Sequence, residues 1–543
     1  MSNRPRSFWG WGYADEEISP KFVQHYKQML QFSLGVSHFE TIAPPTIEQI
    51  HLRPPRFQLP RALNSLCTAE PFDRASHTYG KAYRDVVRGL YGQFDNPPDY
   101  VAYSHNEAEL QMLMAFCAAN GIALIPFGGG TSVVGGVEPP RAAAYGGVIT
   151  ADLRHFDQIL HIDEQSRVAH VQAGIFGPAL EAGLKPHGFT LRHFPQSFEF
   201  STVGGWIATR SGGHYATLYT HIDEFVEGVR MMTPSGTMAT RRLPGSGAGP
   251  SPERLVTGSE GTLGIITEAW LRLQHLPTYR ASATVMFDNE QAGFTAVREL
   301  SQSGLHPANC RLISPLEAFS NRLGDGSQTV LLLSFEAHDH ALDAWLEHGL
   351  AICKKHGGRW AADQVVVQQA GEEKKSSSSA QWKNSFLQLP YLRDLAATWG
   401  VILETFETAV TWDQFPAFHQ AVQQAVMDGI KEQCGGKGFI MWRFTHVYPD
   451  GPAPYYTVAA LGQRGREVEQ WDQIKAAASE AIIQHGGTIT HHHAVGKDHR
   501  PWYTQQSDPL FTKMLVEAKR AVDPNWVLNP EVLLEVPEGS REK

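Results

Sequence analysis

The pattern of apolar and polar positions first becomes regular after a Pro-broken opening segment. Residues 100–105 (YVAYSH) read as a short strand, and residues 123–128 (ALIPFG) read as another. Between them, apolar residues recur at the spacing i, i+3, i+4, i+7 of a helix with one buried face: Leu110, Leu113, Met114 and Cys117. Ser104 and Glu107 form a capping-box signature before this helix, and Gly121 stands where it should end. The segment therefore predicts a β-α-β unit.

Two further alternating segments predict β-hairpins. Residues 158–175 alternate around an Asp-Glu-Gln-Ser turn, and residues 229–240 alternate around Pro-Ser-Gly. From residue 277 the pattern changes to longer amphipathic helices and separate strands, which indicates a second domain. Residues 371–380 are charged and Ser-rich and predict a loop. The stretch 508–534 reads as one helix followed by an Asp-Pro turn.

The chain of 543 residues is too long for one core, because cores rarely exceed roughly 300 residues. We predict an α+β protein in four pieces. They are an N-terminal extension wrapped on the body (1–92), a Gly-rich α+β domain (93–276), a second α+β domain with an antiparallel sheet (277–515), and a C-terminal segment that returns to the first domain (516–543).

Composition narrows the class of protein. Lys and Arg total 46 against 56 Asp and Glu, so a net charge of -10 disfavours binding to nucleic acid. Hydrophobic residues make up 42%, enough for large cores, yet no run of about 20 apolar residues predicts a membrane span. The N-terminus turns acidic where a signal peptide would be apolar. The five cysteines include no C-x-x-C pair, so we expect a cytoplasmic protein without structural zinc.

A run of glycines follows the strand at 123–128. Three consecutive glycines let backbone N–H groups converge without Cβ interference, and neighbouring hydroxyls add donors, as in loops that cradle phosphate. The loop has neither the Lys-Ser/Thr of a Walker A motif nor G-x-G-x-x-G spacing. A flexible turn without a ligand is an equally good interpretation of this loop alone. Its residues are Pro126, Phe127, Gly128, Gly129, Gly130, Thr131 and Ser132.

Two more segments favour a long polar ligand, because they place hydroxyls and glycines beside strands. Together with the glycine loop, residues 195–213 and 257–273 resemble the flavin-binding domain of the vanillyl-alcohol oxidase superfamily, in which FAD lies extended between two small α+β subdomains. Many covalent members have a His in the glycine loop where this chain has Thr131, so we expect FAD to be held non-covalently. The resemblance implies further cofactor-binding residues: Gln196, Ser197, Ser201, Thr202, Thr209, Arg210, Ser211, Glu260, Gly261, Thr262, Leu263, Gly264, Ile265 and Ile266.

Segments of the second domain resemble the alkylglycerone-phosphate synthase family. They are 393–413, 441–460, 486–503 and 523–534, and the likeness extends to the opening WGWGYAD at residues 9–15. The resemblance implies a flavoenzyme without net redox. In such an enzyme, N5 of oxidised FAD attacks C1 of an acyl-dihydroxyacetone phosphate, the fatty acid leaves, and a long-chain alcohol then displaces the flavin. An acyl ester becomes an alkyl ether.

The same resemblance assigns roles to individual residues. It implies that Arg443 binds the substrate phosphate and influences the acid/base tyrosine, that Tyr456 is that tyrosine, and that Arg311 is needed for activity. A planar guanidinium suits a phosphate, and a nearby cation lowers a phenol's pKa. An Arg in a strand more often belongs to a solvated face, and a Tyr-Tyr pair is usually packing. Because neighbouring side chains of a strand point to opposite faces, only one of Tyr455 and Tyr456 can serve directly, and the alignment selects Tyr456.

Three consecutive histidines, His491, His492 and His493, also match the family. If this segment alternates as a strand does, His491 and His493 share a side and could bind a metal. No carboxylate or Cys partner accompanies them, so we expect hydrogen bonds to substrate or flavin and no metal site. The chain departs from the family at Ala494, where Gly is usual, and at Gln196, where Asp is usual. Both departures are compatible with a substrate that differs from the family's usual one.

A flavin-dependent dehydrogenase or oxidase of a 2-hydroxy acid is the alternative function, because a fold does not fix a reaction. Such enzymes often have metal-binding histidines in the second domain. His446 is one candidate, but the second ligand expected a few residues later is missing. A non-catalytic flavoprotein is a distant third. For a synthase, the resemblance implies a lipid-like substrate with a phosphate head, and we leave open a peripheral membrane contact and a homodimer.

Overall fold

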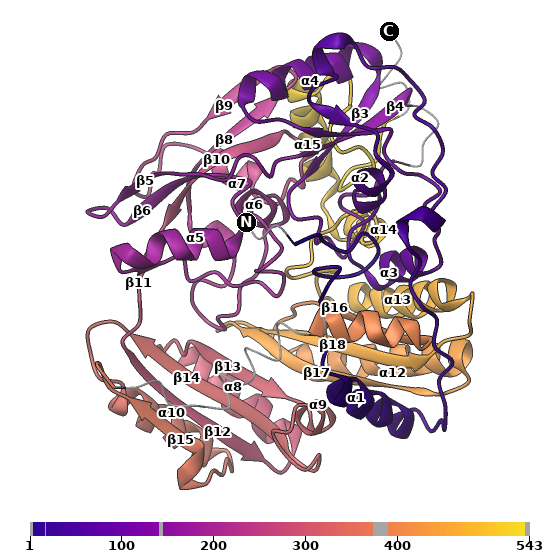
Figure 1. Cartoon of the computed structure of the whole chain (residues 1–543). Coiled ribbons are helices and arrows are strands. Elements are labelled where there is room, and N and C mark those ends of the chain that lie inside the picture. Colours follow the sequence, from indigo (N-terminus) through magenta and orange to yellow (C-terminus); the bar gives the residue numbers. More distant parts are fainter. Residues whose placement is uncertain (1–3, 17, 141–144, 373–388, 538–543) are drawn as a thin grey trace.

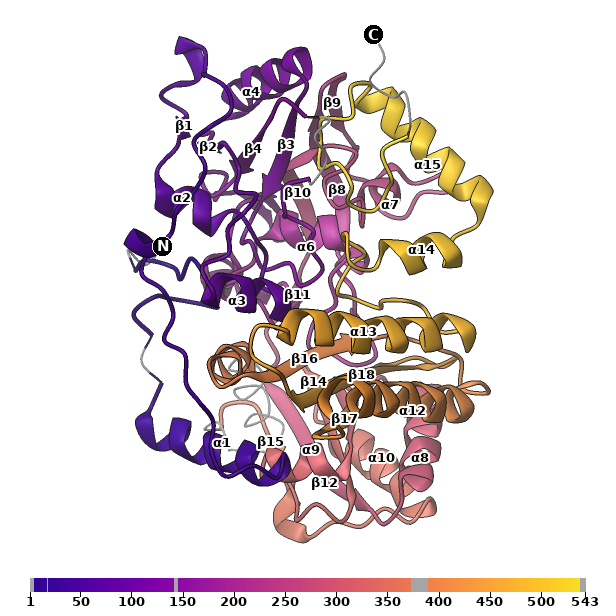
Figure 2. The same ribbon diagram turned by 90° about the vertical axis from the view of Figure 1, so that its right-hand side faces the viewer.

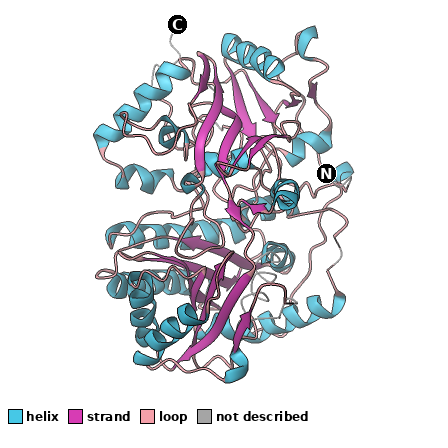
Figure 3. Cartoon of the chain, turned by 90° about the vertical axis from the view of Figure 1, so that its left-hand side faces the viewer, coloured by secondary structure: helices cyan, strands magenta, loops and turns pink. Residues whose placement is uncertain are grey.

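The computed structural model describes residues 4–16, 18–140, 145–372 and 389–537, which form two lobes (Figure 1). The first lobe contains a four-stranded and a five-stranded sheet, and the second is built on a seven-stranded sheet. In Figure 3 the strands of both lobes are surrounded by helices. This arrangement confirms the predicted α+β class with an antiparallel sheet in the second domain.

The first sheet has the order β1-β2-β4-β3 and contains the predicted β-α-β unit. Its strands are β1 (Cys67–Thr68), β2 (Tyr100–Tyr103), β3 (Ile122–Phe127) and β4 (Gly147–Asp152), and the last three are parallel. Helix α4 (Glu107–Asn120) buries the four predicted apolar residues and ends at Gly121 with φ +60°. The predicted cap is wrong: the side chain of Asn106, not Ser104, accepts a hydrogen bond from the Glu109 amide at 3.0 Å.

The second sheet has the order β5-β6-β10-β8-β9 and contains both predicted hairpins. Its strands are β5 (Ile159–Asp163), β6 (Val168–Gln172), β8 (Val226–Thr233), β9 (Gly236–Ala239) and β10 (Ile265–Arg272). The nearby short elements are α5 (Gly177–Leu184), α6 (Val203–Thr209), α7 (Pro252–Val256), and the pair β7 (Phe189–Thr190) and β11 (Gln274–His275). The loop after β3, the start of α6 and the start of β10 all face one cavity, described below.

The seven-stranded sheet is antiparallel with the order β15-β12-β14-β13-β17-β18-β16. Its strands are β12 (Tyr279–Phe287), β13 (Asn309–Ile313), β14 (Thr329–Ala337), β15 (Val365–Gln368), β16 (Val401–Glu407), β17 (Gly438–Val447) and β18 (Pro452–Leu461). Its helices are α8 (Glu290–Gln302), α9 (Pro315–Ser320), α10 (Asp343–Lys355), α12 (Phe415–Cys434) and α13 (Glu467–Gln484). Figure 2 shows α12 and α13 side by side, and their apolar faces join the largest core of the protein.

Both ends of the chain pack on the two lobes. Helix α1 (Pro20–Ser33) contributes Tyr26 and Leu30 to a small core with Trp399 of the second lobe, and α2 (Pro71–Ser76) and α3 (Tyr83–Leu90) follow. After α14 (Arg500–Gln506) and α15 (Pro509–Val522), the chain pairs Leu528 with Leu124 of β3. The C-terminal segment therefore contacts the first lobe.

Most of the predicted loop at 371–380 lies outside the described residues. In the part of the chain that the structure describes, no helix is both long and apolar enough to cross a bilayer.

Candidate active site

A cavity lies between the lobes, and the glycine loop forms part of its wall. The loop packs tightly on residues 200–202: a Cβ at Gly128 would overlap the Thr202 hydroxyl, and one at Gly129 would overlap the Phe200 carbonyl. Gly130 has φ +67°, a left-handed backbone that other residues rarely adopt. These close approaches require glycine and leave bare backbone facing the cavity.

Most of the predicted cofactor-binding residues line this cavity together. The lining includes all seven loop residues and also Gln196, Ser197, Ser201, Thr202, Thr209, Ser211, Glu260, Gly261, Gly264, Ile265 and Ile266. Hydroxyls, backbone and a few apolar side chains in one wall fit a long polar ligand with a planar ring, as a flavin dinucleotide has.

Three predicted residues do not line the cavity. Arg210 follows α6 with φ +51° and forms an ion pair with Asp223. The Thr262 hydroxyl donates to the Ser259 carbonyl at 2.6 Å, and Leu263 belongs to the apolar core of the first lobe. For these three residues, cofactor binding stays a prediction that the lining of the cavity does not support.

The two tyrosines of β18 occupy opposite faces, and the structure places the predicted one away from the cavity. Tyr456 is fully buried in the core, and its hydroxyl lies 2.8 Å from Nδ1 of His419 on α12. Tyr455 lines the cavity, and its hydroxyl donates to Oγ1 of Thr405 at 2.9 Å. Of the two tyrosines, the structure therefore places Tyr455, and not Tyr456, at the cavity.

Tyr455 also contacts the predicted phosphate-binding arginine. The guanidinium of Arg443 lies 4.1 Å from the centre of the Tyr455 ring and pairs with buried Glu317. Burial raises the pKa of Tyr455, and Arg443 offsets part of that rise. Arg443 does not itself line the cavity, so the structure gives it a position behind the tyrosine.

Two other arginines do face the cavity. Arg311 of β13 is 1% exposed and donates from Nη2 to the His214 carbonyl at 3.3 Å. Burial, reinforced by Arg443, lowers the pKa of Arg311 to about 9. Arg393 is buried, and among the described residues its Nε and Nη2 have no hydrogen-bond partner. Its nearest carboxylates, on Asp394 and Glu404, are 3.9 Å away. A cavity lined by two buried guanidinium groups favours an anion.

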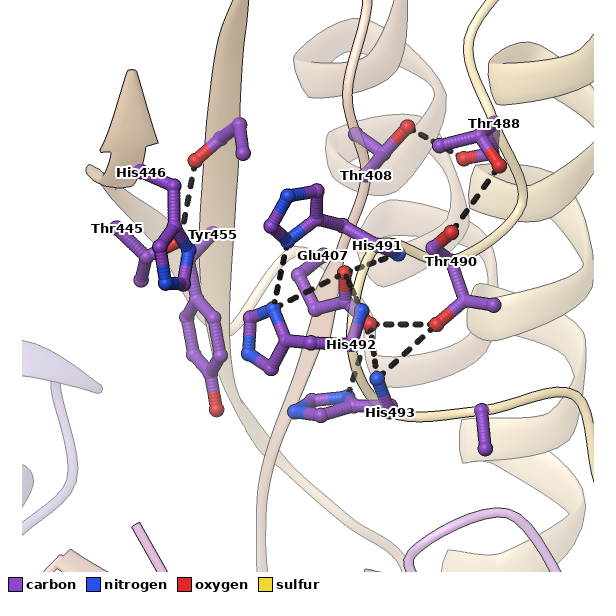
Figure 4. A network of polar contacts seen from close by, with 12 residues as sticks. Glu407, Thr408, Thr445, His446, Tyr455, Thr488, Thr490, His491, His492 and His493 are labelled. Atoms are coloured by element: carbon purple, nitrogen blue, oxygen red, sulfur yellow. Dashed lines mark hydrogen bonds and ion pairs between the residues drawn. The ribbon is translucent and has the colours of Figure 1, made fainter. Parts of the chain in front are cut away.

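The three histidines lie in a loop, not a strand, and Glu407 at the end of β16 holds that loop (Figure 4). Its carboxylate accepts hydrogen bonds from the backbone amides of His491, His492 and His493 at 2.5, 3.1 and 2.8 Å. It also accepts one from the Thr490 hydroxyl at 2.6 Å. Burial raises the pKa of Glu407, but His492, His493 and these donors outweigh burial and hold it well below its usual range.

This loop conformation overturns the predicted alternation of the histidines. His492 and His493 line the cavity, whereas Nδ1 of His491 lies 3.0 Å from Nδ1 of His492. Burial lowers the pKa of His492 to about 3 and of His493 to about 4, against the opposing effect of Glu407. Both imidazoles are therefore neutral at neutral pH.

Glu260 fastens the other end of this loop to the first lobe. Its carboxylate accepts hydrogen bonds from the Val495 and Gly496 amides, each at 2.8 Å. Burial raises the pKa of Glu260 to about 7, although the two amides act against this rise. The histidine loop is therefore tied to both lobes, to the second through Glu407 and to the first through Glu260.

Several cavity residues have only a weak signal in the sequence. Trp11 stands in the WGWGYAD opening and Arg393 in a segment that resembles the family, but neither is distinguished there from its neighbours. Thr405, Thr445 and Asn529 also line the cavity; they too lie in segments that resemble the family, which do not distinguish them from their neighbours. Which of these residues line the cavity depends on the direction of their side chains, and that direction is set by the tertiary fold.

Comparison with known proteins identifies the cofactor. Residues 98–241 match the family described as FAD binding domain, and residues 276–533 match FAD linked oxidases, C-terminal domain. FAD is therefore the cofactor of this chain, and the cavity residues fit it.

Relatives match over most of the chain. An alkyldihydroxyacetonephosphate synthase from Dictyostelium discoideum is 28% identical over 510 residues, covering 90% of this chain and 83% of that protein. Another, from Trypanosoma brucei brucei, is 29% identical over 486 residues, covering 87% of this chain and 79% of that protein. A solved structure of an alkyldihydroxyacetonephosphate synthase shares the fold with a TM-score of 0.78 and 24% identity, covering 96% of this chain and 98% of that one. The two domain matches and these relatives together place the chain in the family of FAD-dependent enzymes that contains the alkyldihydroxyacetonephosphate synthases.

Proposed function

We propose that this chain is an alkylglycerone-phosphate synthase, which exchanges the acyl group of an acyl-dihydroxyacetone phosphate for a long-chain alcohol without net redox. The observation that carries the proposal is a single cavity that joins the glycine loop to Arg311, Arg393 and Tyr455. The glycine loop would hold the diphosphate of FAD. The arginines would supply positive charge for the substrate phosphate, and the tyrosine would supply a proton for the reaction.

We propose Arg393 and Arg311 as the ligands of the substrate phosphate. Arg393 is the stronger candidate, because its buried guanidinium has donors without hydrogen-bond partners in the described part of the chain. A buried cation left in this state is costly, and a phosphate oxygen would satisfy it. Arg443, the residue predicted for this role, acts behind Tyr455 and positions it.

Tyr455 is the proposed acid/base group. FAD supplies the nucleophilic flavin N5 when bound and ends each cycle oxidised. In the overall exchange, the C1–O bond to the acyl group breaks, the fatty carboxylate leaves, and the alcohol oxygen bonds to C1 with release of its proton. With its pKa raised by burial, the phenol is protonated at neutral pH and can donate. Thr405, its hydrogen-bond partner, would orient the hydroxyl.

We also propose a function for each of three segments of the chain. Residues 93–276 would bind FAD, residues 277–515 would form the cap over the substrate, and residues 516–543 would complete the FAD domain. Attachment of FAD would be non-covalent, because Thr131 offers no nucleophile comparable to the imidazole of covalent members.

The enzyme assay separates the proposed reaction from the redox alternative. Purified holoprotein, given palmitoyl-dihydroxyacetone phosphate and hexadecanol under anaerobic conditions, is expected to form ether product while the flavin absorbance stays that of the oxidised state. Flavin bleaching by a simple hydroxy acid such as D-lactate, with no ether formed, would reverse this assignment in favour of a dehydrogenase.

Adjacent tyrosines provide a matched pair of variants. Tyr455→Phe should lower kcat at least about 100-fold, because proton transfer by a positioned group contributes that much or more. Tyr456→Phe should change kcat less than about twofold, because its hydroxyl faces His419 in the core. Bound FAD, measured by absorbance, should be unchanged in both. The reverse ranking of the two rates would contradict the choice of Tyr455.

A lipid-like substrate also suggests a peripheral membrane contact, which we propose for the start of α15. Leu510, Phe511 and Met514 are 66%, 50% and 63% exposed there. The holoprotein should co-sediment with phosphatidylcholine vesicles, and replacing all three residues by Ser should abolish this. Leu255→Ser, at an exposed leucine of α7, is the control. Equal sedimentation of every variant would disprove this contact. A homodimer stays a prediction.

A further inference from the structure

Three histidines form a cluster beside the cavity, and two of them, His446 and His492, line it. His446 comes from β17, and His491 and His492 come from the loop held by Glu407. One ring nitrogen of each lies within 4.8 Å of those of the other two. We propose that His446, His491 and His492 bind one zinc ion whose fourth coordination position opens to the cavity.

The spacing of the nitrogens supports a shared ion. In tetrahedral zinc sites the Zn–N distance is about 2.0–2.1 Å, which places two ligand nitrogens roughly 3.3 Å apart. The Nδ1 atoms of His491 and His492 are 3.0 Å apart. The ring nitrogen of His446 lies within 4.8 Å of the other two, so it would have to approach them to share one tetrahedral ion.

In His446 and His491, a hydrogen bond at Nε2 leaves the Nδ1 lone pair available for a metal ion. Nε2 of His446 lies 3.0 Å from the Gly213 carbonyl, which can only accept, so this nitrogen carries the proton. Nδ1 of His446 has no hydrogen-bond partner among the described residues. Metal-binding histidines usually donate their second N–H to such a carbonyl, which fixes the tautomer.

His491 is oriented in the same way. Its Nε2 lies 2.8 Å from the Tyr448 hydroxyl, and that hydroxyl donates to Oγ1 of Thr220 at 3.1 Å. The tyrosine oxygen is therefore free to accept the proton on Nε2 of His491. This leaves the lone pair of Nδ1 of His491 directed at His492.

The backbone beneath the cluster is already fixed, which reduces the cost of assembling a metal site. The Glu407 carboxylate accepts hydrogen bonds from the backbone amides of both His491 and His492. The amides of this loop already occupy the carboxylate oxygens, one of which stands 3.6 Å from Nδ1 of His492, close enough to balance the charge of an ion. The site therefore has three imidazole ligands and a carboxylate behind them.

The fourth position would face the cavity, because both His446 and His492 line it. Catalytic zinc sites have three protein ligands and one open position for water or substrate, whereas structural sites are closed by four. Three imidazole ligands with an open fourth position are a donor set that zinc has in catalytic sites. A phosphate or carbonyl oxygen of the ligand in the cavity is the chemistry that this ion would bind.

The sequence pattern predicts no metal here, because it offers no partner for the histidine triplet. The fold supplies that partner: His446 is 45 residues before His491 in the chain, and the end of β17 brings it to the loop. The inference is independent of the proposed reaction, since it concerns metal binding and not turnover.

The test measures zinc on the FAD-loaded protein, without an activity assay. Chelator-treated holoprotein is titrated with ZnSO₄ by isothermal titration calorimetry, and zinc retained after gel filtration is quantified by mass spectrometry. We expect one zinc per chain. His446→Gln and His492→Gln should each weaken binding by at least about tenfold, the effect that loss of even a supporting group can have.

His170→Gln is the control variant, because His170 bonds to Glu268 on β10 and lies outside the cluster. It should bind zinc as the unmodified chain does. Flavin absorbance checks that each variant is folded. Wild-type protein that binds no zinc would overturn the proposal and leave a proton shared between His491 and His492 as the explanation of their contact. Equal zinc binding by the His446 and His492 variants would overturn it as well.

Discussion

The close approach of the glycine loop to residues 200–202 is the constraint on which the site depends. Side chains at Gly128 or Gly129 would collide with Thr202 and Phe200, so the loop can take its place only with bare backbone. That placement brings the end of β3, the start of α6 and the start of β10 to one wall. A surface of backbone and hydroxyl groups suits a dinucleotide phosphate, which the loop's sequence alone could not distinguish from a simple turn.

The opposite wall depends on buried charge. Glu407 of the second lobe and Glu260 of the first lobe each accept hydrogen bonds from backbone amides of the histidine loop. The loop is therefore fixed where the lobes meet. The guanidinium groups of Arg311 and Arg393 stand in the same buried space. Among the described residues, two nitrogens of the Arg393 guanidinium have no hydrogen-bond partner, so an anion that enters the cavity would complete its contacts. This requirement connects the fold to a phosphate-bearing substrate.

Local patterns predicted the elements of the fold well, and side-chain direction limited the prediction of the site. The face of α4 and both hairpins follow from residue spacing, because burial imposes the helical and strand periods. The capping residue was missed because Asn106 and Ser104 both suit a helix start. Strand alternation separated Tyr455 from Tyr456 but could not say which face meets the cavity. A strand period does not place the histidines, because Glu407, 84 residues earlier than His491, holds them in a loop.

The central claim is that the cavity between the lobes holds FAD non-covalently through the glycine loop. The most direct test is the visible spectrum of the purified protein, recorded before and after acid precipitation. The account predicts a yellow protein with oxidised-flavin absorbance, all of which moves to the supernatant and is identified there as FAD. A colourless protein that takes up no added FAD, or a yellow pellet with a clear supernatant, would contradict it.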